Sequence, residues 1–175
     1  QIRDRRIDMK KVSLIVPCYN EEQALPIFAR ELDLVVQGLS GYEFEVVMVN
    51  DGSSDKTLDV MRDISAKYGY FKYISFSRNF GKESAMYAGF CNTDGDYVAV
   101  MDADMQDPPS LLPEMLEILE DGEYDSVATR RVTRKGEPPI RSWFARRFYK
   151  LINRISDADV VDGARDFRLM KSDMK

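Results

Sequence analysis

An acidic run, Asp102-Ala103-Asp104-Met105-Gln106-Asp107, is the segment best suited to bind a metal ion. Asp102 and Asp104 are two residues apart, so their side chains point the same way in extended backbone. We expect them to form, together with the amide oxygen of Gln106, a partial octahedral site that substrate phosphates and water can complete around Mg²⁺. Such a cation neutralises charge on a departing diphosphate. The alternative is a solvated acidic turn, with Asp107 close to a helix N-terminus.

The sequence has no histidine, and this absence narrows the possible chemistry. A Ser-His-Asp triad, a His-based zinc site and a His general base are all excluded. Proton transfer must fall to a carboxylate, Lys, Tyr or Cys, and a divalent metal among oxygen ligands is Mg²⁺ or Mn²⁺. Cys18 and Cys91 form neither a disulfide framework nor a zinc site, and we expect both to be reduced.

Three further polar segments follow apolar runs, and each has a functional and a structural interpretation. In PCYNEE, Tyr19 can stack on a base and Glu21 can bind a ribose hydroxyl, or Asn20 simply caps a helix. In VNDGSSDKT, Asp51 can accept hydrogen bonds from a base or ribose, or the segment is only a capping turn. In SRNFGKE, the amides around Gly81, with Arg78 or Lys82, can approach an anion, or the loop is merely solvated.

The elements that must position these segments alternate between strand and helix patterns. Short apolar runs predict strands at 12–16, 44–49, 71–76, 97–101 and 126–129. Helical spacing of apolar residues predicts helices at 21–36, 56–67, 82–91 and, capped by Ser110, 110–119. This order predicts an α/β fold, a doubly wound and mainly parallel sheet with helices on both faces. Ligands of such sheets bind at the carboxyl ends of the strands, where all the polar segments fall.

A basic segment follows the last predicted strand. Residues 130–154 contain nine Lys or Arg and one acid, Glu137, although the whole chain has a net charge of −5. Arg130 and Arg131 follow the strand near the expected site, where their side chains can bind phosphate. Residues 140–155 predict a basic amphipathic helix, which lies on an anionic membrane surface or packs as an ordinary solvated helix. We do not expect nucleic acid as a partner, because no base-stacking aromatics are interleaved on an exposed polar face.

Taken together, the motifs resemble family 2 glycosyltransferases, which have the Rossmann-like GT-A fold. The segments VSLIVPCYNEE, VNDGSSDKT, SFSRNFGKE, MDADMQDPP and DGARDFRLM occur in that family's order and spacing, over about residues 12–170. Within the family, NFGKE, DADMQDPP and RDFRLM look like the polyisoprenyl-phosphate glycosyltransferases. Dolichyl-phosphate mannose synthases lack an acid where Asp166 stands, so the resemblance is greater to the bacterial undecaprenyl-phosphate type.

The resemblance implies roles for individual residues. The predicted nucleotide-binding residues are Pro17, Tyr19, Asn20, Glu21, Asp51, Gly81, Lys82, Asp102 and Ala103. The predicted ligands of Mg²⁺ or Mn²⁺ are Asp102, Asp104 and Gln106. The predicted catalytic residues are Asp104, Arg130, Arg131 and Asp166. Asp166 lies between Arg165 and Arg168, which keep it ionised to orient or deprotonate an acceptor, unless it forms only a structural salt bridge.

We therefore expect one GT-A catalytic domain over 1–175, with a nucleotide-sugar half at 12–130 and a basic acceptor-side arm at 131–175. The predicted reaction is inverting transfer of a hexose from a UDP-sugar, or secondly a GDP-sugar, to a polyprenyl phosphate. A polysaccharide or other glycan acceptor is the alternative, followed by a nucleotide-sugar-binding module without turnover. Relatives usually continue into membrane helices, so we expect a truncated, soluble piece of a protein at the cytoplasmic face of the plasma membrane. A homo-oligomer is compatible with the sequence.

Overall fold

The centre of the fold is a six-stranded sheet whose order is β3-β2-β1-β4-β6-β5. The computed structural model describes residues 9–130 and 164–174. Its strands are β1 Lys10–Cys18, β2 Tyr42–Asn50, β3 Phe71–Ser75, β4 Tyr97–Val100, β5 Ser126–Arg130 and β6 Ala164–Lys171. Its helices are α1 Leu25–Gln37, α2 Thr57–Lys67, α3 Lys82–Cys91 and α4 Leu112–Glu120, with 3-10 turns at Pro109–Leu111 and Ser172–Met174.

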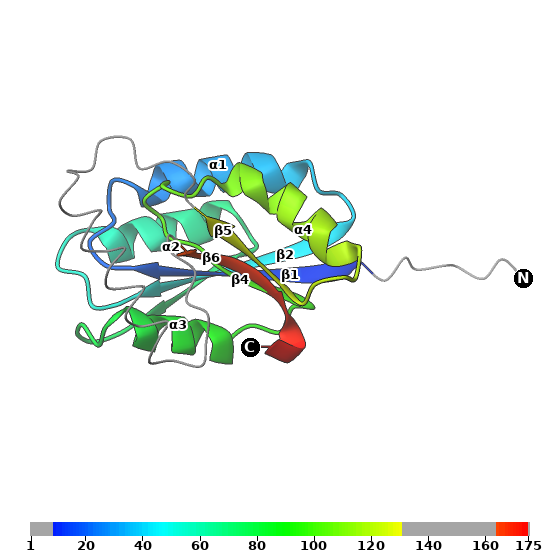
Figure 1. The fold of residues 1–175 in the computed structure, drawn as a ribbon. Helices are drawn as coiled ribbons and strands as arrows, with labels where there is room; N and C mark the ends of the chain where they lie inside the picture. Colours follow the sequence, from blue (N-terminus) through cyan, green and yellow to red (C-terminus); the bar gives the residue numbers. More distant parts are fainter. Residues whose placement is uncertain (1–8, 131–163, 175) are drawn as a thin grey trace, which may run out of the picture.

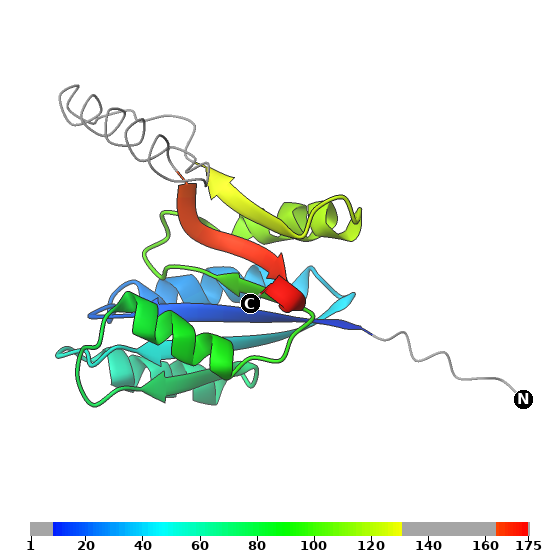
Figure 2. The ribbon, with the colours of Figure 1, turned by 60° about the horizontal axis from the view of Figure 1, so that its bottom comes forward.

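The four strands β1 to β4 are parallel, as the alternating pattern predicted. Strand β6 was not predicted. It pairs antiparallel with both β4 and β5, so a strand from the C-terminal end of the chain separates two strands that are closer in sequence. Figure 2 shows β6 (red) beside β5 (yellow). Because β6 is antiparallel to both neighbours, β5 runs in the same direction as β4, and the sheet is mainly parallel as expected.

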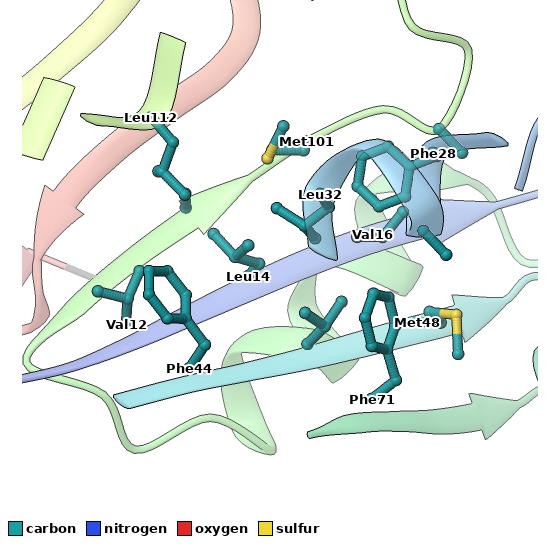
Figure 3. Packing of buried hydrophobic residues seen from close by; sticks show 14 of the residues in the cluster. Val12, Leu14, Val16, Phe28, Leu32, Phe44, Met48, Phe71, Met101 and Leu112 are labelled. Carbon is teal, nitrogen blue, oxygen red and sulfur yellow. The ribbon is translucent and has the colours of Figure 1, made fainter. Parts of the chain in front are cut away.

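The helices cover both faces of the sheet (Figure 1). Alternate residues of each strand face opposite sides, so Leu14 and Val16 belong to one core cluster while Ile15 belongs to another. The larger cluster contains the buried side chains of α1, α2 and α4, among them Phe28, and Figure 3 shows its packing. Helix α3 packs on the opposite face, so closely that a Cβ on Gly89 would lie 2.2 Å from Ile15 Cγ2.

Two predicted helix starts were wrong. Helix α1 begins at Leu25 rather than at 21, and Asn20 makes no capping contact with it, because the preceding residues form a loop. Helix α4 begins at Leu112 rather than at 110. Ser110 lies inside the 3-10 turn Pro109–Leu111 and does not cap α4. Among the residues described, no helix combines the length and apolar character needed to cross a bilayer.

A buried charge network ties the amino ends of β1 and β2 to the turn before β4. The carboxylate of Glu45, 4% exposed, accepts hydrogen bonds from Ser13 Oγ at 2.5 Å and from the Asp94 N–H at 3.2 Å. Lys72 and Lys11 approach it at 3.0 and 3.2 Å. Burial acts to raise the pKa of Glu45, but these donors outweigh it and lower the pKa from 4.5 to about 2.

This lowered pKa predicts a pH-dependent contribution to stability. Because the folded pKa lies below the ordinary value, ionised Glu45 stabilises the fold above about pH 4.5, and that contribution disappears as the pH falls towards 2. We expect about 3 kcal/mol of unfolding free energy to be lost over this range on account of Glu45. Urea denaturation of wild type and Glu45→Gln between pH 6 and 2.5 should therefore give curves that converge at low pH. Curves that stay parallel would contradict the assignment.

Candidate functional site

The polar segments predicted from the sequence meet at one edge of the sheet, around a cavity of about 310 Å³. They follow β1, β2 and β4 or precede α3. Strand β1 lies between β2 and β4, and the connecting helices α1 and α3 cover opposite faces, which is where doubly wound sheets open a ligand crevice. The lining residues are Pro17, Cys18, Tyr19, Glu21, Asp51, Asn79, Gly81, Lys82, Ala85, Asp102, Ala103 and Asp104.

The loops after β1 and β2 are bonded to each other. The Ser54 N–H donates to Asn20 Oδ1 at 2.9 Å, and the Glu22 N–H donates to Asp55 Oδ2 at 3.2 Å. In return the Lys56 N–H donates to Glu22 Oε2 at 2.9 Å. Asn20 has φ of 58°, which asparagine tolerates better than most residues. Asn20 does not line the cavity, and its side-chain oxygen holds the neighbouring loop.

Asp51, at the end of β2, holds the loop before α3. Its buried carboxylate, 3% exposed, accepts the Phe80 N–H at 2.7 Å on Oδ1 and the Gly81 N–H at 3.0 Å on Oδ2. The next residue, Gly52, has φ of 65°, and a Cβ there would lie 2.2 Å from the Arg78 carbonyl carbon. Asp51 thus occupies the Gly81 N–H, and the approach of an anion to the other amides at the start of α3 stays a prediction.

Lys82, the first residue of α3, reaches from this loop to the acidic run. Its Nζ lies 2.8 Å from Asp102 Oδ1 and 2.9 Å from Oδ2. Both side chains are a little over one-third exposed, so water reaches the pair. The ammonium therefore contacts both oxygens of a predicted metal ligand.

The acidic run turns sharply after its two carboxylates. Met105 has φ of 60°, a conformation that long side chains rarely adopt, and the Gln106 N–H donates to Asp104 Oδ1 at 3.0 Å. Asp102 and Asp104 line the cavity, whereas Gln106 is exposed outside its lining. Asp107 accepts a hydrogen bond from Thr129 Oγ1 at 3.3 Å and so connects the run to β5.

The carboxylates give the cavity a negative electrostatic character. Burial, then the negative charges of Asp104, Asp102 and Asp55, raise the pKa of Glu21. Burial, then Glu21 and Asp102, raise the pKa of Cys18 well above its ordinary value, which keeps it a thiol. A cavity of this charge favours a cation.

The donor set fits a hard divalent cation. Within 9–130 and 164–174, no three His, Cys, Asp or Glu side chains gather in metal-binding geometry. Asp102 and Asp104 supply two carboxylates to the cavity lining, and Mg²⁺ and similar ions accept one or two carboxylates when phosphates and water complete their coordination. The two residues therefore suit a cation that is bound together with a phosphorylated ligand.

The remaining predicted residues lie at the same edge or outside the described chain. Because β5 runs parallel to β4, its last residue, Arg130, is at the carboxyl edge. Strand β6 starts at that edge: Arg168 pairs with Val100, and Asp166 lies two residues further towards the acidic run. Arg131 and the predicted helix at 140–155 lie outside the described residues.

Three cavity residues were missed from the sequence: Cys18, Asn79 and Ala85. Cys18 and Asn79 sit inside segments already recognised, PCYNEE and SRNFGKE, so their position next to predicted residues was the available signal. Ala85 offered no such signal, because an alanine within a helix has no distinctive chemistry.

Sequence comparison adds a family match. Residues 13–174 match the family model described as "Glycosyl transferase family 2". CsbB of Bacillus subtilis (strain 168) is 43% identical over 159 residues, which make up 91% of this chain and 47% of that protein. The prophage bactoprenol glucosyl transferase homolog of Escherichia coli (strain K12) is 38% identical over 164 residues, 94% of this chain and 53% of that protein. The chain thus spans about half the length of these curated relatives.

Structural comparison confirms the predicted fold class. Glucosyl-3-phosphoglycerate synthase from Mycobacterium tuberculosis, solved with Mn²⁺, UDP-glucose and phosphoglyceric acid, superposes with a TM-score of 0.69 at 19% identity. The match covers 94% of this chain and 58% of that one. At this identity the likeness establishes the GT-A fold alone.

Proposed function

The chain belongs to glycosyl transferase family 2, and from that premise we propose that it transfers a hexose from a nucleotide sugar to a polyprenyl phosphate, with inversion. The observation that carries the proposal is the cavity that Asp102 and Asp104 line together with residues of the loop after β1. The prophage bactoprenol glucosyl transferase homolog of Escherichia coli (strain K12) and the bactoprenol glucosyl transferases of Shigella phages are similar over nearly the whole chain, which favours glucose and a lipid phosphate acceptor.

In the proposed mechanism, the nucleoside occupies the part of the cavity lined by Pro17, Tyr19 and Glu21. Tyr19 is half exposed, so its ring is available to stack on a base. Uracil is our first choice of base and guanine the second. Glu21 lies within the same lining and can accept a hydrogen bond from a ribose hydroxyl.

Asp102 and Asp104 would hold Mg²⁺ or Mn²⁺ against the donor diphosphate. When bound, the ion supplies charge neutralisation for the leaving nucleotide. Arg130 ends β5 at the same edge of the sheet, and with Arg131 it would meet phosphate groups. The protein's own task is to fix the diphosphate so that its bond to the sugar lies open to attack.

The acceptor phosphate is already an anion, so it needs orientation more than deprotonation. We assign that orientation to Asp166, whose backbone β6 places beside the end of β4. The acceptor would approach along an anionic membrane surface at the cytoplasmic face of the plasma membrane, with the basic residues of 140–155 as its contact. Orientation and electrostatic stabilisation then supply most of the rate.

A transfer assay tests the proposal. Labelled UDP-glucose and GDP-mannose are each incubated with the chain, detergent-dispersed undecaprenyl phosphate and Mn²⁺, and lipid-linked sugar is extracted. We expect more label in the lipid phase with UDP-glucose than with GDP-mannose. When EDTA removes the Mn²⁺, we expect no label there. Label only on an added oligosaccharide would instead support the glycan-acceptor alternative. Mn²⁺-dependent UDP binding without transfer to any acceptor would support a non-catalytic binding module.

A further inference from the structure

The ion pair between Lys82 and Asp102 occupies the position where the proposed metal would bind. One ammonium contacts both carboxylate oxygens, at 2.8 and 2.9 Å. A divalent ion that binds Asp102 must therefore share the carboxylate with Lys82 or displace it. The partial exposure of both side chains leaves room for this exchange, since water can solvate whichever group is released.

Lys82 is important because of the charges that surround it in the cavity. Among the described residues that line the cavity, Lys82 is the only cation, and the lining it shares includes the carboxylates of Glu21, Asp102 and Asp104. Asp51 is a fourth carboxylate, but two backbone N–H groups satisfy it. The position of Lys82 is fixed through that same contact, because the residue before it, Gly81, is bonded to Asp51.

We propose that Lys82 is the resident counter-ion of the metal site, which holds Asp102 when no metal is bound and moves to the donor diphosphate when a divalent cation takes its place. The inference rests on the proposed function and deepens it, since it makes metal binding and nucleotide binding depend on one side chain. Asp102 stays neutralised in both states: by Lys82 before the metal arrives and by the metal afterwards.

The exchange has a signature that a structural salt bridge or a simple phosphate contact lacks. In the absence of nucleotide, Lys82 opposes the metal, because its charge is close to the metal position and competes for Asp102. Removing it should tighten Mn²⁺ binding, by roughly 5- to 20-fold for a unit charge at this range in a partly exposed site. In the presence of Mn²⁺, Lys82 assists the diphosphate, so removing it should weaken UDP binding by roughly 10-fold or more.

The experiment measures both affinities in one variant. Mn²⁺ binding without nucleotide is followed by the electron paramagnetic resonance signal of free Mn²⁺, and UDP binding at saturating Mn²⁺ by calorimetry. Lys82→Met removes the charge, and Lys82→Gln is a second neutral variant in case the first folds poorly. Lys82→Arg keeps the charge and should bind Mn²⁺ like wild type. Lys72→Met is the matched control, because it removes a lysine from an ion pair with Glu45 at the amino end of the strands.

Opposite changes in the two affinities, confined to the neutral Lys82 variants, support the exchange. Unchanged or weaker Mn²⁺ binding in both neutral variants would overturn it, whatever happens to UDP. Tighter Mn²⁺ binding together with weaker UDP binding in Lys72→Met would also overturn it, since the effect would then be one of overall charge. A wild-type chain that binds neither Mn²⁺ nor UDP would count against the proposed function itself, and the inference would fall with it.

Discussion

Replacing Asp104 with alanine is expected to abolish Mn²⁺-dependent binding of UDP while the chain stays folded. Asp104 is exposed and lines the cavity, and it accepts a hydrogen bond from the Gln106 N–H in a local turn. Its loss leaves Asp102 as the single carboxylate of the predicted pair. Half of the anionic ligand set is then missing, so we expect UDP affinity in Mn²⁺ to fall roughly 100-fold or more, which corresponds to about 3 kcal/mol.

A variant in the same acidic run provides the control. Asp107 bonds to Thr129 Oγ1 and does not line the cavity, so Asp107→Ala should lose about 1 kcal/mol of stability and still bind UDP. Calorimetric titrations with Mn²⁺ and with EDTA, together with thermal melts, separate the two effects. Asp104→Ala that binds UDP as wild type does would refute the metal assignment. Equal losses in both variants would show that the run acts only as a structural turn.

Replacing Asp51 with asparagine is expected to destabilise the protein even when no nucleotide is present. The carboxylate is buried and accepts two N–H groups, whereas an asparagine side chain offers one oxygen and places its own N–H₂ against the second donor. We expect a loss of about 2–3 kcal/mol of unfolding free energy, the cost of leaving a buried donor unpaired. Nucleotide affinity should fall as well, because the loop from Arg78 to Lys82 is no longer held against the cavity.

Stability in the absence of ligand distinguishes this role from direct contact with the nucleoside. If Asp51 only bound the base or ribose, Asp51→Asn would melt like wild type and lose affinity alone. Gly52→Ala should reproduce the stability loss, since its Cβ would collide with the Arg78 backbone and its φ of 65° disfavours a side chain. Asp125→Ala removes an exposed acid paired with Lys171 and should change stability by less than about 0.5 kcal/mol.

These contacts connect the part of the cavity that we assign to the nucleoside with the part that we assign to the metal. Asp51 holds Gly81, and the following residue, Lys82, pairs with Asp102. The loops after β2 and β4 are therefore linked through the start of α3. A change at Asp51 is expected to affect metal binding through Lys82, which a titration of Asp51→Asn with Mn²⁺ would measure.

Much of the fold followed from the sequence by itself. The apolar runs from Val12 to Val16 and from Phe44 to Val49 are strands, and helical spacing located α2 and α3 within a residue or two. These patterns are local: a strand or helix repeats its buried face every few residues, so periodicity is visible in the chain itself. Since parallel strands bring their carboxyl ends to one edge, the sequence also predicted which polar segments would meet there.

The partners of individual side chains were decided by tertiary structure. Asp51 was predicted to contact a ligand, but its carboxylate accepts N–H groups 29 and 30 residues away, and Lys82 finds Asp102 at a separation of 20. Strand β6 enters between β4 and β5 because its Phe167 and Leu169 complete a core that distant elements build. Such contacts depend on the register and packing of segments far apart in the chain, and no local pattern encodes them. The sequence thus determined the kinds of chemistry at this site, and the packing of its loops decided which groups stay open to a ligand.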